Sequence, residues 1–294
     1  MSDPSTDLPR RRVLITGLGP VSALGLGVDA LWAGLSEGRS ALAPIRQFDA
    51  SEFDCAIAGE VPEDFKIRNF VPKSYRKATK VMARDIELAV AAAHLAVQDA
   101  GITTPGSDPD GQRSYASPRM GVHIGAGLIA TEENELTYAL DAARAEDGSF
   151  DINKWGSEGM SQLTPLWLLK YLPNMLACHV TIIHDAQGPS NTITCNEASA
   201  MLSLGESLRV IQRGQADACL SGGADSKMTP MALLRQVLAG RCNTTDKDEP
   251  GKAVRPFCQT AAGTVLGEGG AVLVLESVET FEQRGGEKAY AEVV

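Results

Sequence analysis

The residues best suited to chemistry lie between positions 188 and 200. The β-branched run Thr192-Ile-Thr194 predicts a short strand, and the small residues after it open an apolar helix that Gly214 ends. The N-terminus of a helix carries unpaired N–H groups and the positive end of the helix dipole. A side chain at such a turn is placed to act as a nucleophile or to meet an anion. Cys195 and Glu197 are the reactive residues at this turn.

Two other patterns invite a different interpretation. Gly17-Leu-Gly19 follows the apolar run that starts at Val13, as in a dinucleotide-binding turn. Position 22, where that fingerprint needs a third glycine, holds Ser22, so a tight turn is favoured and a dinucleotide-binding module remains the alternative. Ser190 and Ser199 lie outside the G-x-S-x-G frame of a serine hydrolase.

The composition excludes several classes of protein. Lys and Arg number 27 against 37 Asp and Glu, and a net charge of -10 argues against nucleic-acid binding. A basic segment at 73–84 is either a patch for an acidic partner or a solvated helix face. No run approaches the roughly 20 apolar residues that span a membrane, and no signal peptide is recognisable. We expect a soluble cytoplasmic protein that contacts no membrane.

The cysteines and histidines do not show the spacing of a metal site. The 6 cysteines include no C-x-x-C pair, and the 4 histidines are scattered. Reduced, mostly buried thiols explain the cysteines. We therefore expect no metal and no cofactor.

The elements around the turn indicate an α/β protein. A three- and four-residue apolar repeat predicts a helix from 74 to 100, and short apolar runs predict strands at 120–124, 218–220 and 271–275. Helices that alternate with short buried strands are typical of a sheet covered on both faces.

Several segments in this order resemble the β-ketoacyl synthase family of thiolase-like condensing enzymes. They are Val13–Gly19, Gly125-Ala-Gly127, Gly188-Pro-Ser190, Ser221–Asp225, Arg255-Pro-Phe257 and Gly263–Gly270. The resemblance implies the N-terminal half of the ketosynthase fold, a mixed sheet between helical layers. The polar residues 1–10 predict a disordered N-terminus. The resemblance places the N-terminal-type domain at 11–286 and the start of an otherwise missing C-terminal half at 287–294.

The family's cysteine nucleophile lies nine residues after the glycine of Gly-Pro-Ser and eight before a helix glycine. Counted from Gly188 and from Gly205, both distances reach Glu197. Cys195 lies two residues earlier, a displacement of roughly 6.6 Å along a strand, and is an alternative nucleophile. Glu197 fits a second interpretation as well, a capping box with Thr194 that fastens the helix start. Under either interpretation Glu197 carries no acyl group.

Other family positions also differ in this chain. Cys258 and Ala261 stand where the family usually has Asp and Arg after Arg-Pro-aromatic. The family's two catalytic histidines and its lysine belong to the C-terminal half, and no histidine of this chain can be assigned their role.

The resemblance therefore predicts a homologue of fatty-acid or polyketide biosynthesis that does not condense. It is similar to the chain-length-factor subunits of polyketide synthases, in which the nucleophile is also replaced. Its expected partners are acyl carrier protein, in acyl or malonyl form, and a ketosynthase in a homo- or heterodimer. Leu128 is either a wall of the acyl tunnel or a core residue. The alternatives are an active 3-oxoacyl-carrier-protein synthase, a malonyl-carrier-protein decarboxylase and a functionless copy.

Overall fold

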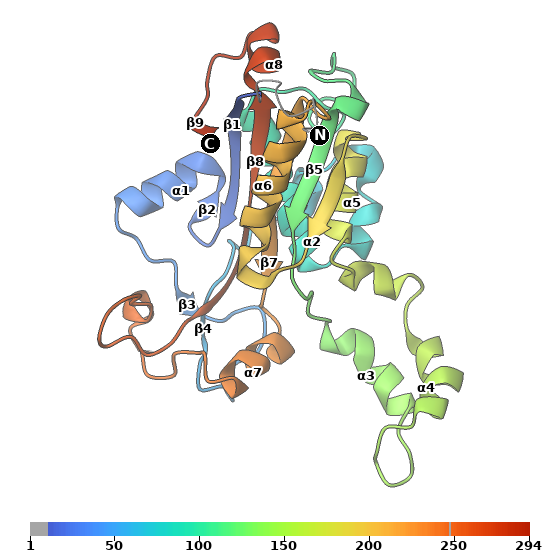
Figure 1. Ribbon diagram of the computed structural model, residues 1–294. Coiled ribbons are helices and arrows are strands. Elements are labelled where there is room, and N and C mark those ends of the chain that lie inside the picture. The colour runs from blue at the N-terminus through green and yellow to red at the C-terminus, as the bar shows by residue number, and fades with distance from the viewer. Residues whose placement is uncertain (1–10, 247) are drawn as a thin grey trace, which may run out of the picture.

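The computed structural model describes residues 11–246 and 248–294, and a mixed sheet lies at its centre (Figure 1). The sheet order is β2-β1-β8-β7-β5-β6. These strands are β2 (Gly25–Leu26), β1 (Val13–Ser22), β8 (Leu266–Ser277), β7 (Ala218–Ser226), β5 (Met120–Gly125) and β6 (Ser190–Ile193). β5 runs parallel to β6 and β7, whereas β8 runs antiparallel to β7 and β1.

Helices cover both faces of this sheet. The helices α2 (Arg84–Asp99) and α5 (Met175–His184) share the larger core with the strands, and α6 (Ser199–Gln212) packs a second core on the opposite face. Ile86 and Leu176 on one side and Ile211 on the other are fully buried. The predicted mixed sheet between helical layers is therefore confirmed.

The predicted turn at Gly17-Leu-Gly19 is wrong, because both glycines lie inside β1. A Cβ atom at Gly19 would lie 1.9 Å from the carbonyl oxygen of Ala92, and one at Gly17 would lie 2.3 Å from that of Ala96. The glycines thus let the backbone of α2 lie directly on the strand. Gly267–Gly270 likewise lies within β8 and not in a turn.

The helix expected from 74 to 100 begins only at Arg84. Met82 and Ala83 have extended backbone and separate α2 from two short 3-10 turns, η3 (Lys73–Tyr75) and η4 (Ala78–Val81). The segment 73–84 is therefore no single helix face.

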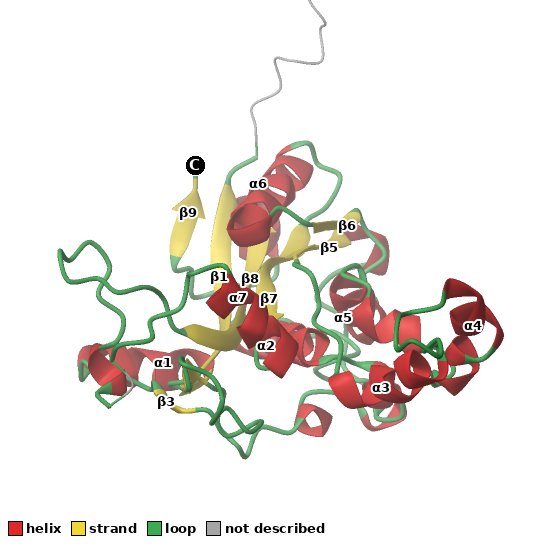
Figure 2. Cartoon of the chain, turned by 90° about the horizontal axis from the view of Figure 1, so that it is seen from below, coloured by secondary structure: helices red, strands yellow, loops and turns green. Residues whose placement is uncertain are grey.

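Between β5 and α5 the chain forms an arm that extends to one side of the sheet (Figure 2). It contains α3 (Glu133–Ala142), α4 (Ile152–Ser157), η6 (Gly159–Gln162) and η7 (Trp167–Tyr171). The remaining elements are α1 (Gly27–Ser36), β3 (Ala43–Pro44), β4 (Ile57–Gly59), η2 (Ile67–Asn69), η5 (Ser117–Arg119), η8 (Asn196–Ala198), α7 (Pro230–Leu238), η9 (Pro250–Lys252), α8 (Val278–Gln283) and β9 (Ala291–Val293).

The structure describes the C-terminal end of the chain but not the first ten residues. Residues 1–10, expected to be disordered, lie outside the described residues. At the other end, β9 pairs antiparallel with β1. Within the part of the chain that the structure describes, no helix has the length and apolar character to cross a membrane.

Candidate functional site

The predicted turn at 188–200 lies at the edge of the sheet where the parallel strands β5, β6 and β7 end. This edge is where open α/β sheets commonly bind ligands. The start of α6 lies directly over Gly125, where a Cβ atom would be 2.4 Å from the amide nitrogen of Ala200. Glycine at the end of β5 therefore allows the helix N-terminus to meet the strand ends.

The turn itself is held by Ser199 and not by the predicted capping box. Its buried Oγ accepts a hydrogen bond from the Cys195 N–H at 2.8 Å and donates one to the Asn196 carbonyl at 2.6 Å. Asn196 has a left-handed backbone with a φ of 48°, which turns the chain sharply before Glu197. Neither η8 nor α6 has a side-chain cap, so the capping box of Thr194 and Glu197 is wrong.

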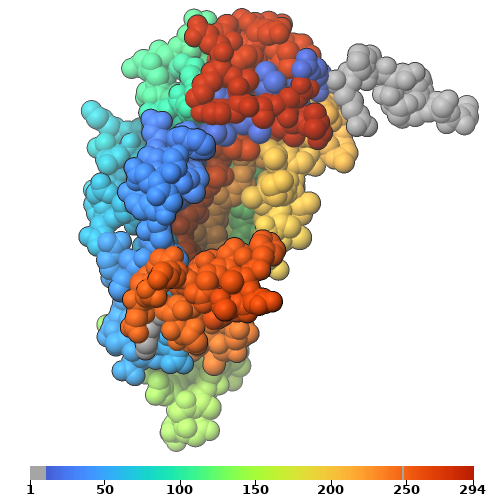
Figure 3. Space-filling model, turned by 90° about the vertical axis from the view of Figure 1, so that its left-hand side faces the viewer, coloured from blue at the N-terminus to red at the C-terminus, as the bar shows by residue number. Residues whose placement is uncertain are grey.

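Glu197 is exposed and lines a pocket of about 590 Å³, which opens on the face hollowed between α6 and α7 (Figure 3). The walls come from three strand ends and from the region of α7. The charged residues among them are Glu197, Asp225, Lys227, Arg235 and Arg241. The Lys227 ammonium pairs with Asp225 at 2.5 Å.

Of the other predicted site residues, Leu128 lies at the pocket of Glu197 and Cys195 does not. Leu128 lines the same pocket as Glu197 and is 69% exposed, so it is no core residue in this chain. Cys195 is exposed but does not line the pocket. Of these two residues, Glu197 and not Cys195 therefore lines the hollow.

None of the four histidines lines this pocket either. His123, His179 and His184 are buried, and each bonds a hydroxyl group through Nδ1, that of Ser207, Tyr75 and Thr104 respectively. Burial lowers the pKa of all three and brings that of His184 to about 3. They are neutral core residues.

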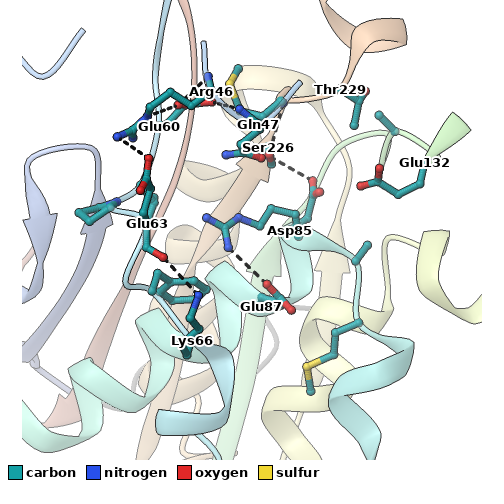
Figure 4. A pocket seen from close by; sticks show the side chains of 18 of the residues that line it. Arg46, Gln47, Glu60, Glu63, Lys66, Asp85, Glu87, Glu132, Ser226 and Thr229 are labelled. Carbon is teal, nitrogen blue, oxygen red and sulfur yellow. Dashed lines mark hydrogen bonds and ion pairs between the residues drawn. The ribbon is translucent and has the colours of Figure 1, made fainter. Parts of the chain in front are cut away.

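A second pocket, of about 500 Å³, lies beside the start of α2 (Figure 4). Its charged walls mostly pair with one another, because Arg46 contacts Glu60 and Glu63 at 3.0 Å each and Arg84 contacts the buried Glu268 at 2.7 Å. Glu268 also accepts from the Gln47 side chain at 2.9 Å and from the Val61 N–H at 3.0 Å, so it joins the segment 46–63 to α2 and β8, and few groups are left for a ligand.

Asp85 is the exception in this second pocket. Its carboxyl is buried and accepts a hydrogen bond from the Ser226 N–H at 3.3 Å. Burial, with the neighbouring Asp225 carboxylate, raises the pKa of Asp85 to about 8. Because Asp225 also lines the pocket of Glu197, this carboxyl pair lies between the two pockets.

Sequence reasoning did not identify Arg235 and Arg241 as site residues. Arg235 lies on the amphipathic helix α7 and Arg241 follows the end of that helix, so each looks like an ordinary solvated cation. Only the packing of α7 across the strand ends brings them to the pocket of Glu197.

The family profile "Beta-ketoacyl synthase, N-terminal domain" matches residues 10–280. The chain belongs to the β-ketoacyl synthase family. The neighbouring folds agree with this assignment, since the structure titled "The ishigamide ketosynthase/chain length factor" superimposes with a TM-score of 0.76 at 28% identity. That comparison covers 97% of this chain and 62% of the other.

Curated relatives in the family come from both fatty-acid and polyketide systems. The chain is 32% identical over 290 residues to 3-oxoacyl-[acyl-carrier-protein] synthase 2 of Synechocystis, which covers 98% of this chain and 62% of the relative. It is 31% identical over 281 residues to the actinorhodin polyketide putative beta-ketoacyl synthase 2 of Streptomyces coelicolor, which covers 96% of this chain and 62% of the relative. The chain thus spans about 62% of the length of these relatives.

Proposed function

We propose that this ketosynthase homologue of fatty-acid or polyketide biosynthesis is a non-condensing subunit that pairs with an active ketosynthase. The proposal depends on one observation. At the strand-to-helix turn, Glu197 is the charged residue that lines the pocket, and no cysteine is among the residues that line it. The likeness to a structure titled as a ketosynthase/chain length factor supports the same assignment.

The chemistry of the two groups explains why this substitution stops condensation. A thiolate accepts an acyl chain as a thioester, which can be transferred onward. A carboxylate would form an anhydride, which water attacks readily. The positive end of α6 favours the negative charge of Glu197, so the site retains the electrostatics of an anion site without the nucleophile.

The alternatives are an acyltransferase that uses Cys195 and a decarboxylase of malonyl groups. Cys195 is exposed and lies outside the pocket. The Glu197 carboxylate would repel a malonyl carboxylate of like charge. Both observations favour the non-condensing function.

When the purified protein is incubated with acyl and malonyl carrier protein, we expect its intact mass to stay unchanged. No carbon dioxide release above that of the carrier protein alone is expected either. An acyl adduct that disappears in Cys195→Ala would overturn the proposal. Carbon dioxide release that disappears in Glu197→Ala would establish the decarboxylase instead.

The partner ketosynthase has a suitable place to bind at β6, the last strand of the sheet (Figure 2). Its residues Ser190 and Asn191 are exposed, and the Thr192 N–H donates a hydrogen bond to the side-chain Oδ1 of the adjacent Asn191, at 2.9 Å. An unpaired strand edge is a template for another strand. We propose that subunits pair along β6.

Thr192→Pro removes that N–H, so we expect the protein to lose its homo- or heterodimer with a co-expressed ketosynthase while remaining folded. Light scattering after gel filtration measures the change. Thr192→Val, which keeps the N–H, is the matched control and should pair as the parent does. A proline variant that still pairs would place the interface elsewhere.

Acyl carrier protein, the other proposed partner, is acidic and needs a basic surface. Lys73, Arg76, Lys77 and Lys80 are exposed around η3 and η4, and no ion pair of theirs is present among the described residues. Arg84 is committed to Glu268 and Glu87. We propose the four exposed cations as the carrier-protein patch.

A further inference from the structure

Two buried cysteines that the proposed function does not use lie together in the apolar cluster that joins α7 to β4. Cys55 is fully buried, Cys242 is 8% exposed, and both thiols are free. Their side chains share a hydrogen bond, and Ile57 of β4 and Leu233 of α7 belong to the same cluster, below the main sheet in Figure 1. A disulfide forms only between two sulfur atoms that can approach each other, and this pair meets that condition.

One neighbouring segment holds the backbones of both cysteines in place. Cys242 forms a parallel bridge with Thr264, just before β8 begins. Leu266, the first residue of β8, pairs parallel with Ala58, which follows Cys55 by three residues. The two cysteines are far apart in the sequence, and they meet because the segment that enters β8 pairs with both of their segments.

We propose that Cys55 and Cys242 form a reversible disulfide when the folded protein meets hydrogen peroxide. The Cys242 sulfur, the more accessible of the two, attacks one peroxide oxygen. The O–O bond breaks, the thiol proton leaves with the departing hydroxide as water, and Cys242 becomes a sulfenic acid. The Cys55 sulfur then attacks that sulfur, the S–O bond breaks, and a second water leaves with the Cys55 proton. Two thiols are oxidised to one disulfide, and one hydrogen peroxide is reduced to two waters.

The surroundings of the pair decide which oxidant reaches it and how fast it reacts. Apolar packing around the two sulfur atoms excludes a bulky oxidant such as oxidised glutathione and favours a small one such as hydrogen peroxide. Burial, with the neighbouring Cys55 thiol, raises the pKa of Cys242 to about 11, so thiolate is scarce at neutral pH and the first step is slow. Cys219 is equally buried, but the partners of its thiol are the Ser207 side chain and the Gly121 backbone. Burial alone therefore does not produce such a pair.

The disulfide fixes one wall of the pocket of Glu197. Arg241, which lines that pocket, directly precedes Cys242, and Leu233 in the middle of α7 packs in the cysteine cluster. A covalent link from Cys242 to Cys55 limits how far the end of α7 can move away from β4. The redox state of the pair thus sets the mobility of that wall, whether or not the protein condenses.

The experiment treats the whole folded chain with hydrogen peroxide, unfolds it, blocks the remaining thiols with N-ethylmaleimide and digests it without reductant. We expect mass spectrometry to find the peptide of Cys55 linked to that of Cys242, lighter by two hydrogen atoms than the separate peptides. Dithiothreitol should release both. Complete alkylation of Cys55 and Cys242 would overturn the inference, as would a linked peptide that forms only when peroxide is added to the unfolded chain.

Cys242→Ala and a control, Cys258→Ala, test whether the link changes the protein. Each is compared with its own reduced form, so a cost of the substitution itself does not matter. After oxidation the parent and Cys258→Ala, which lacks only an exposed thiol, should melt roughly 5–10 °C higher, because the link restricts the unfolded chain. Their α7 amides should also exchange hydrogen more slowly. Cys242→Ala should show neither change, and an equal rise of its melting temperature would refute the inference.

Discussion

Gly19→Ala is expected to lower the free energy of unfolding by about 3 kcal/mol or more, the upper range for forcing an atom into a packed interior. The added Cβ would lie 1.9 Å from the carbonyl oxygen of Ala92 and 2.5 Å from the amide nitrogen of Ala96. Both are backbone atoms of α2, so no rotamer change can relieve the overlap. The strand and the helix must separate, and both belong to the larger core. Urea unfolding followed by circular dichroism measures the loss.

Gly205→Ala is the matched control for this substitution. Gly205 lies in the middle of α6, where a Cβ atom would have no neighbour within 4 Å. Alanine there should stabilise the protein by about 0.5–1 kcal/mol, because glycine loses more backbone entropy in a helix. If both alanine variants changed stability equally, the contact of α2 with β1 would not explain the role of Gly19.

The same contact explains why the sequence misled at Gly17 and Gly19. Two glycines after an apolar run indicate a turn when only local preferences are considered. Here glycine is needed because the backbone of α2, about 70 residues later in the chain, lies directly against the strand. A local sequence pattern carries no information on a contact with so distant a segment. The same limit applies to Gly267–Gly270 in β8.

Patterns formed by neighbouring residues predicted the secondary structure more reliably. The strand-to-helix change at 192–199 follows from β-branched residues and then small ones, and the structure has β6 and α6 at those places. In place of the capping box, the buried Oγ of Ser199, five residues after Thr194, accepts from the Cys195 N–H and donates to the Asn196 carbonyl. Spacing alone could not rank these two hydroxyl-bearing residues.

The pocket shows what only tertiary structure provides. Glu197 and Leu128 were predicted from motifs, and they do line one pocket. Arg235 and Arg241 reach that pocket through the position of α7, which no spacing in the sequence encodes. The number of cations in the site could be known only from the fold.

Asp85→Asn is expected to stabilise the protein at neutral pH. In the folded chain the pKa of Asp85 is raised to about 8, first by burial and then by the adjacent Asp225 carboxylate, from an ordinary value of 3.8. Between these two pH values the folded state holds a proton that the unfolded chain has lost. The contribution of Asp85 to stability is therefore largest below about pH 4 and falls as the pH rises towards 8.

Asparagine keeps the oxygen that accepts from the Ser226 N–H and supplies an N–H for Asp225, but it never ionises. We expect Asp85→Asn to gain about 4 kcal/mol at pH 7, from 1.36 kcal/mol for each pH unit above the ordinary pKa of 3.8, and to gain almost nothing at pH 4. Urea unfolding at pH 4, 5, 6, 7 and 8 gives the profile. Asp110→Asn, which changes an exposed carboxylate, should follow the parent at every pH. A variant Asp85→Asn that loses stability equally at all pH values would show that Asp85 acts as a charged partner, since only a proton held in the folded state makes the gain grow with pH.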